Sequence, residues 1–245
     1  MRNAWLVAQR ELGAIFVQPI AYVFIIMILL ITGYIFAAQI AFYVLQFGGG
    51  PPPSVANVLG LFTFLAIFAA PAVTMRLLSE EQRSGTMELL MTLPIRDGEV
   101  VFGKWLAAFI FYLASVALTI IYPVILIRFG NPDVGPIFSG YLGTILWGAG
   151  LLGVGVLASA VSENQIVSFM LAFGLNLALY LAALAGQSFT SNPTITNVLN
   201  QFSYEAHLGG FLDGVMTATD VVYYILVTAV ALFAATRILE TRRWR

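Results

Sequence analysis

The distribution of charge along this chain constrains its fold more than any other feature. From Leu12 to Met75 the sequence contains no Asp, Glu, Lys, Arg or His, and from Trp105 to Ile127 it is again uncharged. Between these runs, the segment Ser79–Trp105 carries eight of the 23 charged side chains (11 basic plus 12 acidic). A helix of about 20 apolar residues is long enough to cross a bilayer. The pattern therefore predicts membrane-spanning helices on both sides of a polar connecting segment.

Composition places the whole chain in the membrane class. Only 9% of the residues are charged and 60% are hydrophobic, whereas a soluble domain carries about 25% charged residues. A soluble fold of this size could not bury so much apolar surface, so the solvent must be lipid. Because spanning segments must satisfy their own backbone, we expect an all-α polytopic protein forming one membrane domain over residues 1–245. The N-terminus shows no cleavable signal peptide pattern.

Six spans are predicted from the uncharged runs and the turn residues between them. The first two are Ile20–Phe42 and Val55–Met75, separated by the turn-forming GGGPPPS segment, and Pro71 is expected to kink the second. Lys104 and Arg128 bracket the third, and Asp133 and Glu163 bracket the fourth. The fifth is Ile166–Ala185. The sixth is Val221–Thr236, an uncharged run of only 16 residues, so Arg237 must extend its side chain towards the interface for this helix to cross.

Short helices are expected outside the spans. Residues 1–18 place Trp5, Leu12, Ile15 and Phe16 near one helical face, which is typical of a helix lying in the interface, although a charged lead-in to the first span is an alternative. In the long polar stretch 186–220, four apolar residues recur at helical spacing but are too few to span. They predict a short amphipathic or re-entrant helix: Leu208, Phe211, Leu212 and Val215.

Two features inside the spans predict helix packing. Small residues recur at a spacing of four in the fourth span, where they let helix backbones approach closely, with a gating hinge as the alternative. These residues are Gly140, Thr144 and Gly148, together with Ala149 and Gly153. Asn176, midway along the fifth span, is more often an interhelical hydrogen-bonding group than a substrate contact.

Basic residues predict the orientation. With six spans both termini lie on one side, and ten of the 11 Lys and Arg residues fall on that side while Arg128 alone falls on the other. Because basic residues concentrate in cytoplasmic segments, we expect cytoplasmic termini and a cytoplasmic segment 76–104, in a cell membrane. The 186–220 stretch is then extracytoplasmic.

The chain shows little chemistry of its own. Gly98–Lys104 (GEVVFGK) matches the start of a phosphate-binding loop, but Trp105 replaces the hydroxyl residue and no strand precedes it, so we favour a helix that starts behind an Asp97 cap. The absence of Cys and the single histidine, His207, argue against a metal cluster. The spans hold no ionisable residue except tyrosine, whereas ion-coupled transporters usually keep one there. Energy for any transport is therefore expected to come from elsewhere.

The charged segment has the pattern of a short cytoplasmic helix with a polar start and an apolar end. Ser79 and Gln82 fit a capping box, Gly85 interrupts the helix, Thr86 can cap a second part, and Pro94 ends it. We expect Glu80, Glu81 and Arg83 to be exposed at the polar start. A solvated loop with an apolar stripe facing the core is the alternative.

At these residues the sequence resembles the ABC-2-type exporter permeases, in particular their gliding-motility-type branch. The segment EEQRSGTMELLMTLPIRDGEVVFGKWLAA looks like the cytosolic loop of that family. Four segments in the family's order extend the resemblance over nearly the whole chain: QPIAYVF, PAVTMRLLSEE, SENQIVSF and AHLGGFLDGVMTATDVVYY. The chain departs from the pattern at Asp213, where the gliding-type branch frequently has a basic residue, which puts any inferred contact at the outer face in doubt.

The resemblance implies a function. The chain would be the permease subunit of an ATP-binding cassette exporter, paired with a second permease subunit (homodimer or heterodimer) and two ATPase subunits, with an extracytoplasmic accessory protein possible. ATP and Mg²⁺ would bind the ATPase, and no cofactor is expected on this chain. The loop would couple to the ATPase, and residues 1–18 would help hold the dimer. The implied coupling residues are Glu80, Glu81, Arg83, Ser84, Gly85, Thr86, Glu88, Leu89, Leu90 and Leu93.

Cargo would pass between the two permease subunits, along the second and fifth spans. The candidate path residues are Phe64, Phe68, Phe169, Phe173, Asn176 and Tyr180, although lipid-facing aromatic residues look the same in sequence. Two other classes stay open: a membrane anchor of a surface machine that transports nothing, and an ATP-independent channel or secondary transporter.

Overall fold

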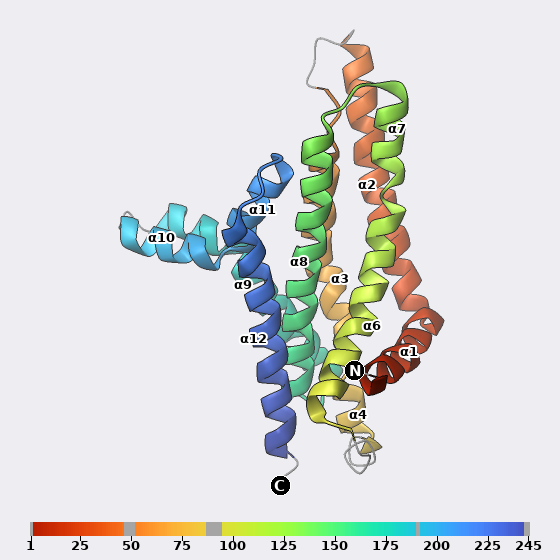
Figure 1. Ribbon diagram of the computed structural model, residues 1–245, viewed down its shortest axis with the longest axis vertical. Helices are drawn as coiled ribbons and strands as arrows, with labels where there is room; N and C mark the ends of the chain where they lie inside the picture. Colours follow the sequence, from red (N-terminus) through yellow and green to blue (C-terminus); the bar gives the residue numbers. More distant parts are fainter. Residues whose placement is uncertain (1, 47–51, 87–94, 190–191, 243–245) are drawn as a thin grey trace.

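The computed structural model describes residues 2–46, 52–86, 95–189 and 192–242, and every regular element in these ranges is an α-helix (Figure 1). The helices are α1 (Arg2–Val17), α2 (Pro19–Leu45), α3 (Val55–Thr74), α4 (Ser79–Arg83), α6 (Asp97–Leu118), α7 (Ile121–Phe129), α8 (Val134–Val161), α9 (Gln165–Phe189), α10 (Pro193–Phe202), α11 (Tyr204–Leu212) and α12 (Ala218–Arg242). The all-α class is confirmed.

Six helical segments in the described ranges are long and apolar enough to cross a membrane, as expected. They are Ala21–Leu45, Val55–Arg83, Asp97–Phe129, Val134–Val161, Gln165–Ser188 and Ala218–Thr241. Pro19 starts α2 at its first turn, where a missing N–H costs nothing. Pro71 lies inside α3. The sixth span is longer than predicted, because the helix continues past Arg237, whose guanidinium lies over the Phe233 ring and pairs with Glu240.

Helix α8 forms the centre of the bundle and contacts α3, α6, α9, α11 and α12 (Figure 1). Its small residues explain this position. A side chain at Gly148 would overlap the Tyr112 ring of α6, and one at Gly143 would come within 2.6 Å of Phe211 of α11. The prediction that small residues in the fourth span serve close packing is confirmed.

Two short helices follow α9 partway along the bundle, and α2, α7 and α8 extend beyond α10 on the side away from the termini (Figure 1). Helix α10 runs crosswise to the spans, and α11 turns back against α8 (Figure 1). Leu208 and Phe211 are buried in the core, which confirms a short helix at these positions, but Val215 lies beyond it and is exposed. The first turns of α12 hold this unit: the Tyr223 hydroxyl donates to the Phe202 carbonyl at 2.6 Å, and that of Tyr224 to the Tyr204 carbonyl at 2.7 Å.

The sole histidine belongs to the same connection. His207 Nδ1 lies 2.6 Å from the Asp220 carboxylate, and the imidazole stacks on the Tyr223 ring. Asp220 also accepts from the Thr217 hydroxyl. No group of three or more metal-ligating side chains occurs in the described part of the chain. The histidine therefore joins α11 to α12.

Candidate functional site

Helix α4 leads from the second span into the charged segment, and it is fixed to α8 at its first residue. The Ser159 hydroxyl of α8 accepts from the backbone N–H groups of Leu78 and Ser79, at 3.0 and 3.1 Å, and donates to the Met75 carbonyl. The Gln82 amide donates to the Ala160 carbonyl at 3.1 Å. These contacts satisfy groups that a helix end otherwise leaves unpaired.

The predicted capping box at Ser79 and Gln82 is wrong. The Ser79 side chain is buried and donates back to the Met75 carbonyl, while Gln82 reaches α8. A side chain that binds another helix is not free to cap its own. Tertiary contacts with α8 have replaced the local cap.

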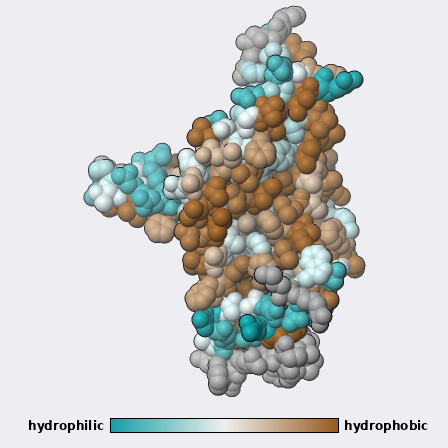
Figure 2. Space-filling view, viewed as in Figure 1, coloured by the Kyte–Doolittle hydropathy of each residue, from teal (hydrophilic) through white to brown (hydrophobic). Residues whose placement is uncertain are grey.

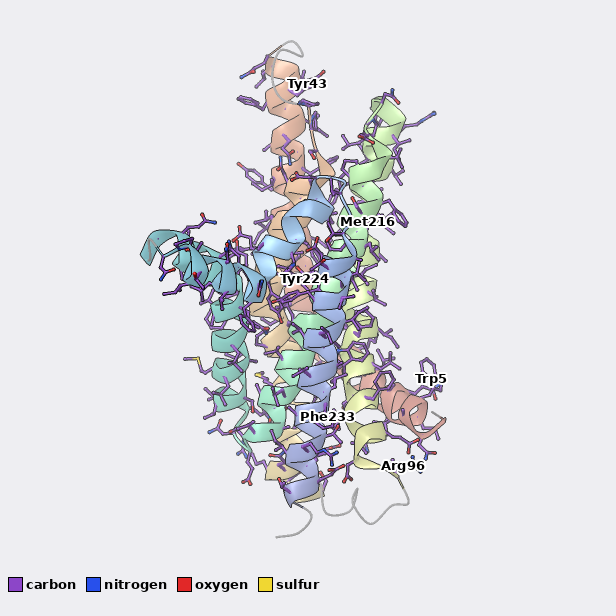
Figure 3. The ribbon with its side chains drawn as sticks, turned by 60° about the vertical axis from the view of Figure 1, so that its left-hand side comes forward. Trp5, Tyr43, Arg96, Met216, Tyr224 and Phe233 are labelled. Carbon is purple, nitrogen blue, oxygen red and sulfur yellow. The ribbon has the colours of Figure 1, made fainter. Side chains whose placement is uncertain are left out.

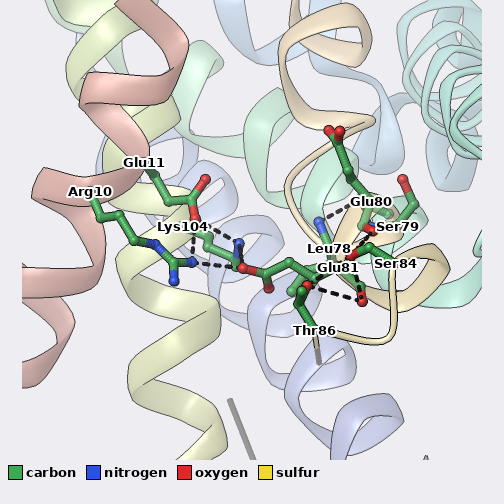
Figure 4. A network of polar contacts seen from close by, with 10 residues as sticks. Arg10, Glu11, Leu78, Ser79, Glu80, Glu81, Ser84, Thr86 and Lys104 are labelled. Carbon is green, nitrogen blue, oxygen red and sulfur yellow. Dashed lines mark hydrogen bonds and ion pairs between the residues drawn. The ribbon is translucent and has the colours of Figure 1, made fainter. Parts of the chain in front are cut away.

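Four charged side chains meet where α1, α4 and α6 come together (Figure 4). Lys104 of α6 places its Nζ 2.9 Å from Glu11 Oε1 and 3.0 Å from Glu81 Oε1. Arg10 of α1 places one guanidinium nitrogen 2.8 Å from the same Glu11 oxygen and 2.7 Å from the same Glu81 oxygen. We call these residues, Arg10, Glu11, Glu81 and Lys104, the α1–α4–α6 ion cluster.

Burial distinguishes this cluster from a surface ion pair. The Lys104 side chain is 1% exposed and those of Glu11 and Glu81 are each 14% exposed. Water therefore screens the pairs only weakly, and removing one partner would leave a buried charge poorly compensated. The expectation that Glu81 is exposed is wrong, whereas Glu80 and Arg83 are exposed as predicted.

The charges in the cluster shift the pKa of Glu11. Burial of the carboxyl group acts to raise its pKa, but the nearby Lys104 ammonium and the hydrogen bonds from Arg10 and Lys104 outweigh it, so the pKa of Glu11 lies below its usual value. The hydrogen bond to Glu11 in turn raises the pKa of Arg10. Arg10 and Glu11 thus stabilise each other in their charged forms.

A glycine lets α1 lie close enough to form the cluster. A Cβ at Gly103 would be 2.6 Å from the Ala4 carbonyl oxygen and 2.9 Å from Val7 Cβ, so α1 contacts the backbone of α6 there. Asn3 adds a hydrogen bond of 3.2 Å to Glu99. Trp5 and Phe16 stay exposed on α1, as expected of a helix at a lipid interface, whereas Ile15, which was predicted on the same face, is buried in the core.

These contacts explain the phosphate-loop-like sequence. Gly98–Lys104 is helical throughout, within the first two turns of α6, as we favoured over a phosphate-binding loop. Gly103 admits α1, and Lys104 pairs with acidic residues of two other helices. The predicted Asp97 cap is wrong in detail: Asp97 is the first helical residue, and the Glu99 carboxylate accepts from the Arg96 N–H at 3.3 Å.

The described part of the charged segment ends shortly after α4. Gly85 has a φ of +71°, so it breaks the helix in a conformation that other residues rarely adopt. The Ser84 hydroxyl bonds to the Glu80 carbonyl and lies 2.8 Å from the Thr86 hydroxyl. Glu88, Leu89, Leu90 and Leu93 lie outside the described residues.

The candidate path residues form a line of aromatic rings between α3 and α9. Ring centroids lie 6.2 Å apart for Phe169 and Phe173, 5.0 Å for Phe173 and Phe68, 5.7 Å for Phe68 and Phe64, and 5.7 Å for Phe64 and Tyr180. Phe64 and Phe68 are more than one-third exposed. The five aromatic residues thus share one apolar surface.

Asn176 does not belong to that surface. Its side chain is fully buried, and its amide donates to the Leu151 carbonyl of α8 at 3.3 Å. The interhelical hydrogen bond that we favoured from the sequence is therefore present. Sequence reasoning missed Trp147, which is fully buried in α8 and contacts the rings of Tyr180, Tyr204 and Tyr224.

Comparison with known proteins supports the resemblance to the ABC-2-type permeases, but it does not support the gliding-motility-type branch. No curated protein sequence gives a significant match. The profile of a protein family described as ABC-2 family transporter protein matches residues 8–244, which is nearly the whole chain. With its six apolar helices, this multi-pass membrane protein belongs to the ABC-2 transporter family, as a permease of an ABC transporter.

Proposed function

We propose that the chain is the membrane-spanning subunit of an ATP-binding cassette exporter, and that it couples ATP hydrolysis on a separate ATPase subunit to the movement of a substrate. The family implies association with an ABC ATPase. The observation that supports coupling is the α1–α4–α6 ion cluster. A force on α4 would reach α1 and α6 through buried charges and would reach α8 through Ser159.

The proposed orientation has both termini in the cytoplasm. Helix α1, helix α4 and the C-terminal end of α12 lie at one end of the bundle, and Arg128 lies at the end of α7 near the other (Figure 1). The basic residues concentrated at the first end support a cytoplasmic location for it. The coupling segment, Glu80 to Leu93, would then face the ATPase subunit, which would hold ATP and Mg²⁺.

The transporter would contain two copies of the ATPase and two permease subunits, either identical or different. Closure of the ATPases would push the coupling segments and shift the spans between inward-facing and outward-facing states. The aromatic surface of α3 and α9 would line the path between the permease subunits. An extracytoplasmic accessory protein would complete some such complexes.

The sequence leaves one alternative open that can be compared directly with the exporter. In this alternative the chain anchors a surface machine: it binds the ATPase but moves no substrate. The purified complex, reconstituted in vesicles, separates the two. Substrate identified by mass spectrometry and ATP-dependent uptake into inside-out vesicles support the exporter, whereas ATP hydrolysis with no bound or transported molecule supports the anchor.

The same preparation tests whether an ATPase is needed. The isolated permease should show no saturable ATP binding, since Gly98–Lys104 is a packed helix start. Saturable binding to the isolated chain, or transport that continues without any ATPase subunit, would contradict the proposal and favour a channel or a secondary transporter.

A further inference from the structure

Helix α7 stands apart from α8 in both ribbon views, although α6, which leads into it, packs along α8 (Figures 1 and 3). The chain changes course at Thr119 and Ile120, between the two helices. Beyond them, the Tyr122 ring packs on Phe36 of α2 with centroids 5.0 Å apart, and the Tyr122 hydroxyl lies 3.1 Å from that of Thr32. Helix α2 therefore holds one side of α7, and the opposite side is left uncovered.

An apolar groove of about 460 Å³ lies between this uncovered side and α8. Val124 and Ile127 line it from α7, and Phe138 and Tyr141 line it from α8. Val124, Ile127 and Phe138 are 53%, 54% and 65% exposed. The hydroxyl of Tyr141 already has a partner, since it lies 3.1 Å from the Thr119 hydroxyl. The groove thus offers an occupant apolar contact and no charge.

The groove lies where acyl chains surround the protein. Both of its walls belong to candidate membrane spans, Asp97–Phe129 and Val134–Val161. From Leu113 to Ile127 its wall on α6 and α7 runs roughly 20 Å at 1.5 Å per residue, and one leaflet contributes roughly 15 Å of bilayer hydrocarbon. Hydrophilic residues gather near the top of the molecule in Figure 2, at the level of the turn between α7 and α8 in Figure 1. The upper end of the groove therefore meets the headgroups.

A cation lies at this end of the groove. Arg128 follows Val124 by four residues, so the two side chains share one face of α7, one turn apart. The Arg128 side chain is exposed and forms no ion pair with another residue of the described ranges. A guanidinium group binds phosphate through two parallel hydrogen bonds. An apolar groove with a basic residue at its polar end matches the two parts of a phospholipid.

We propose that the groove between α7 and α8 holds an acyl chain of an anionic phospholipid from the leaflet opposite the termini, and that Arg128 binds the phosphate of this lipid. A zwitterionic headgroup brings its own cation, whereas an anionic one leaves its charge for Arg128. The bound chain fills the space between the third and fourth spans. Lipid that only solvates the bundle has no headgroup preference at one position, so selectivity distinguishes a site from ordinary membrane contact.

Photocrosslinking from single cysteines tests the proposal, since the chain contains no cysteine of its own. Val124→Cys carries a benzophenone in the groove, and Leu226→Cys carries one on an exposed position of α12 as the control. Both residues are more than half exposed, so neither label displaces a packed side chain. The full chain, with its ATPase where that copurifies, is reconstituted in phosphatidylcholine containing a minor share of phosphatidylglycerol. Mass spectrometry identifies the crosslinked lipid.

We expect phosphatidylglycerol to be enriched severalfold over its share of the vesicle at 124, and to match its share at 226. Arg128→Gln should abolish the enrichment at 124, and Arg128→Lys should retain part of it. Ala117→Phe, at an exposed position that lines the groove, should reduce lipid crosslinking at 124 by filling the space of the acyl chain.

Two results would overturn the proposal. Crosslinked lipid at 124 with the composition of the vesicle, unchanged by Arg128→Gln, would mean that the groove is ordinary membrane contact. Crosslinks from 124 to a second copy of the chain or to another protein would mean that protein, and not lipid, covers the groove.

Discussion

Lys104 shows how strongly one residue can depend on its neighbours in space. In the sequence it is the last residue of the phosphate-loop-like segment Gly98–Lys104, and in the structure it is a buried cation between Glu11 and Glu81. No local pattern connects these three positions, because they come from three helices. The ion cluster therefore could not be predicted from the sequence, whereas the helical state of Gly98–Lys104 could.

Replacing Lys104 should weaken both the fold and the coupling. Lys104→Met leaves Glu11 and Glu81 with Arg10 as their remaining close cation, and breaking a buried pair costs about 3–5 kcal/mol. Thermal unfolding of the purified permease should show the loss. Arg237→Met, which breaks the exposed pair with Glu240, is the control and should cost no more than about 1 kcal/mol. Equal effects of the two substitutions would contradict the role given to the cluster.

Lowering the pH should weaken the α1–α4–α6 ion cluster and lower the stability of the fold. The pKa of Glu11 is lowered in the folded protein, so its ionised form contributes stability above the unfolded value of 4.5. This contribution is lost as the pH falls from there through the folded pKa. Glu11→Gln should therefore flatten the acid limb of the stability profile, measured by thermal unfolding between neutral pH and pH values below 4.5. An unchanged acid limb in the variant would show that Glu11 does not carry this dependence.

At the scale of the elements, periodicity and turn residues predicted the spans well. Long apolar runs locate five of them closely, because lipid leaves a helix few alternatives. The sixth was predicted too short, because the prediction ended the span before the charged residue Arg237. In the structure the helix continues past Arg237, which pairs with Glu240. Helix α10 was missed because it lies in a stretch that starts with turn-forming residues and mixes amides and hydroxyls with its few apolar residues.

Helix α8 gives a sharp test of close packing. Gly148→Val would force a side chain into the space of the Tyr112 ring, and overpacking of this kind costs typically about 1–3 kcal/mol. Gly174→Val is the control, because a Cβ at Gly174 of α9 meets nothing within 4 Å. The melting temperature of the purified protein should fall for the first substitution and change little for the second. A permease with Gly148→Val that melts like wild type would contradict the arrangement of α6 and α8.

Gly85 tests the break after α4. Its φ of +71° costs other residues about 1–2 kcal/mol, but Asn tolerates this region better than most. Gly85→Val should therefore lower ATP hydrolysis by the assembled complex, whereas Gly85→Asn should retain most of it. Since a Cβ at Gly85 meets nothing within 4 Å, a clash inside the chain does not explain a difference. Equal activity of the two variants would mean that the positive φ is not needed.

At the scale of the whole molecule, the family and the uncharged interior of the spans both favour a transporter whose path and energy source lie on different subunits. In the proposed function, the permease supplies the path and a partner supplies the energy. Sequence could indicate this division because missing intramembrane charges and the charged loop are both visible in the chain. It could not indicate how the loop connects to the spans, which depends on Ser159, Gly103 and the ion cluster.

The central claim is that the segment from Glu80 to Leu93 contacts the ATPase, and capture of that subunit by the permease tests it most directly. Fully burying a leucine contributes about 1.5–3 kcal/mol, so Leu89→Ala with Leu90→Ala should weaken assembly enough to lose the ATPase during purification. The control is Leu30→Ala with Leu45→Ala, at two exposed positions of α2. The account predicts that only the first pair releases the ATPase; retention of the partner at wild-type affinity by the Leu89–Leu90 variant would contradict it.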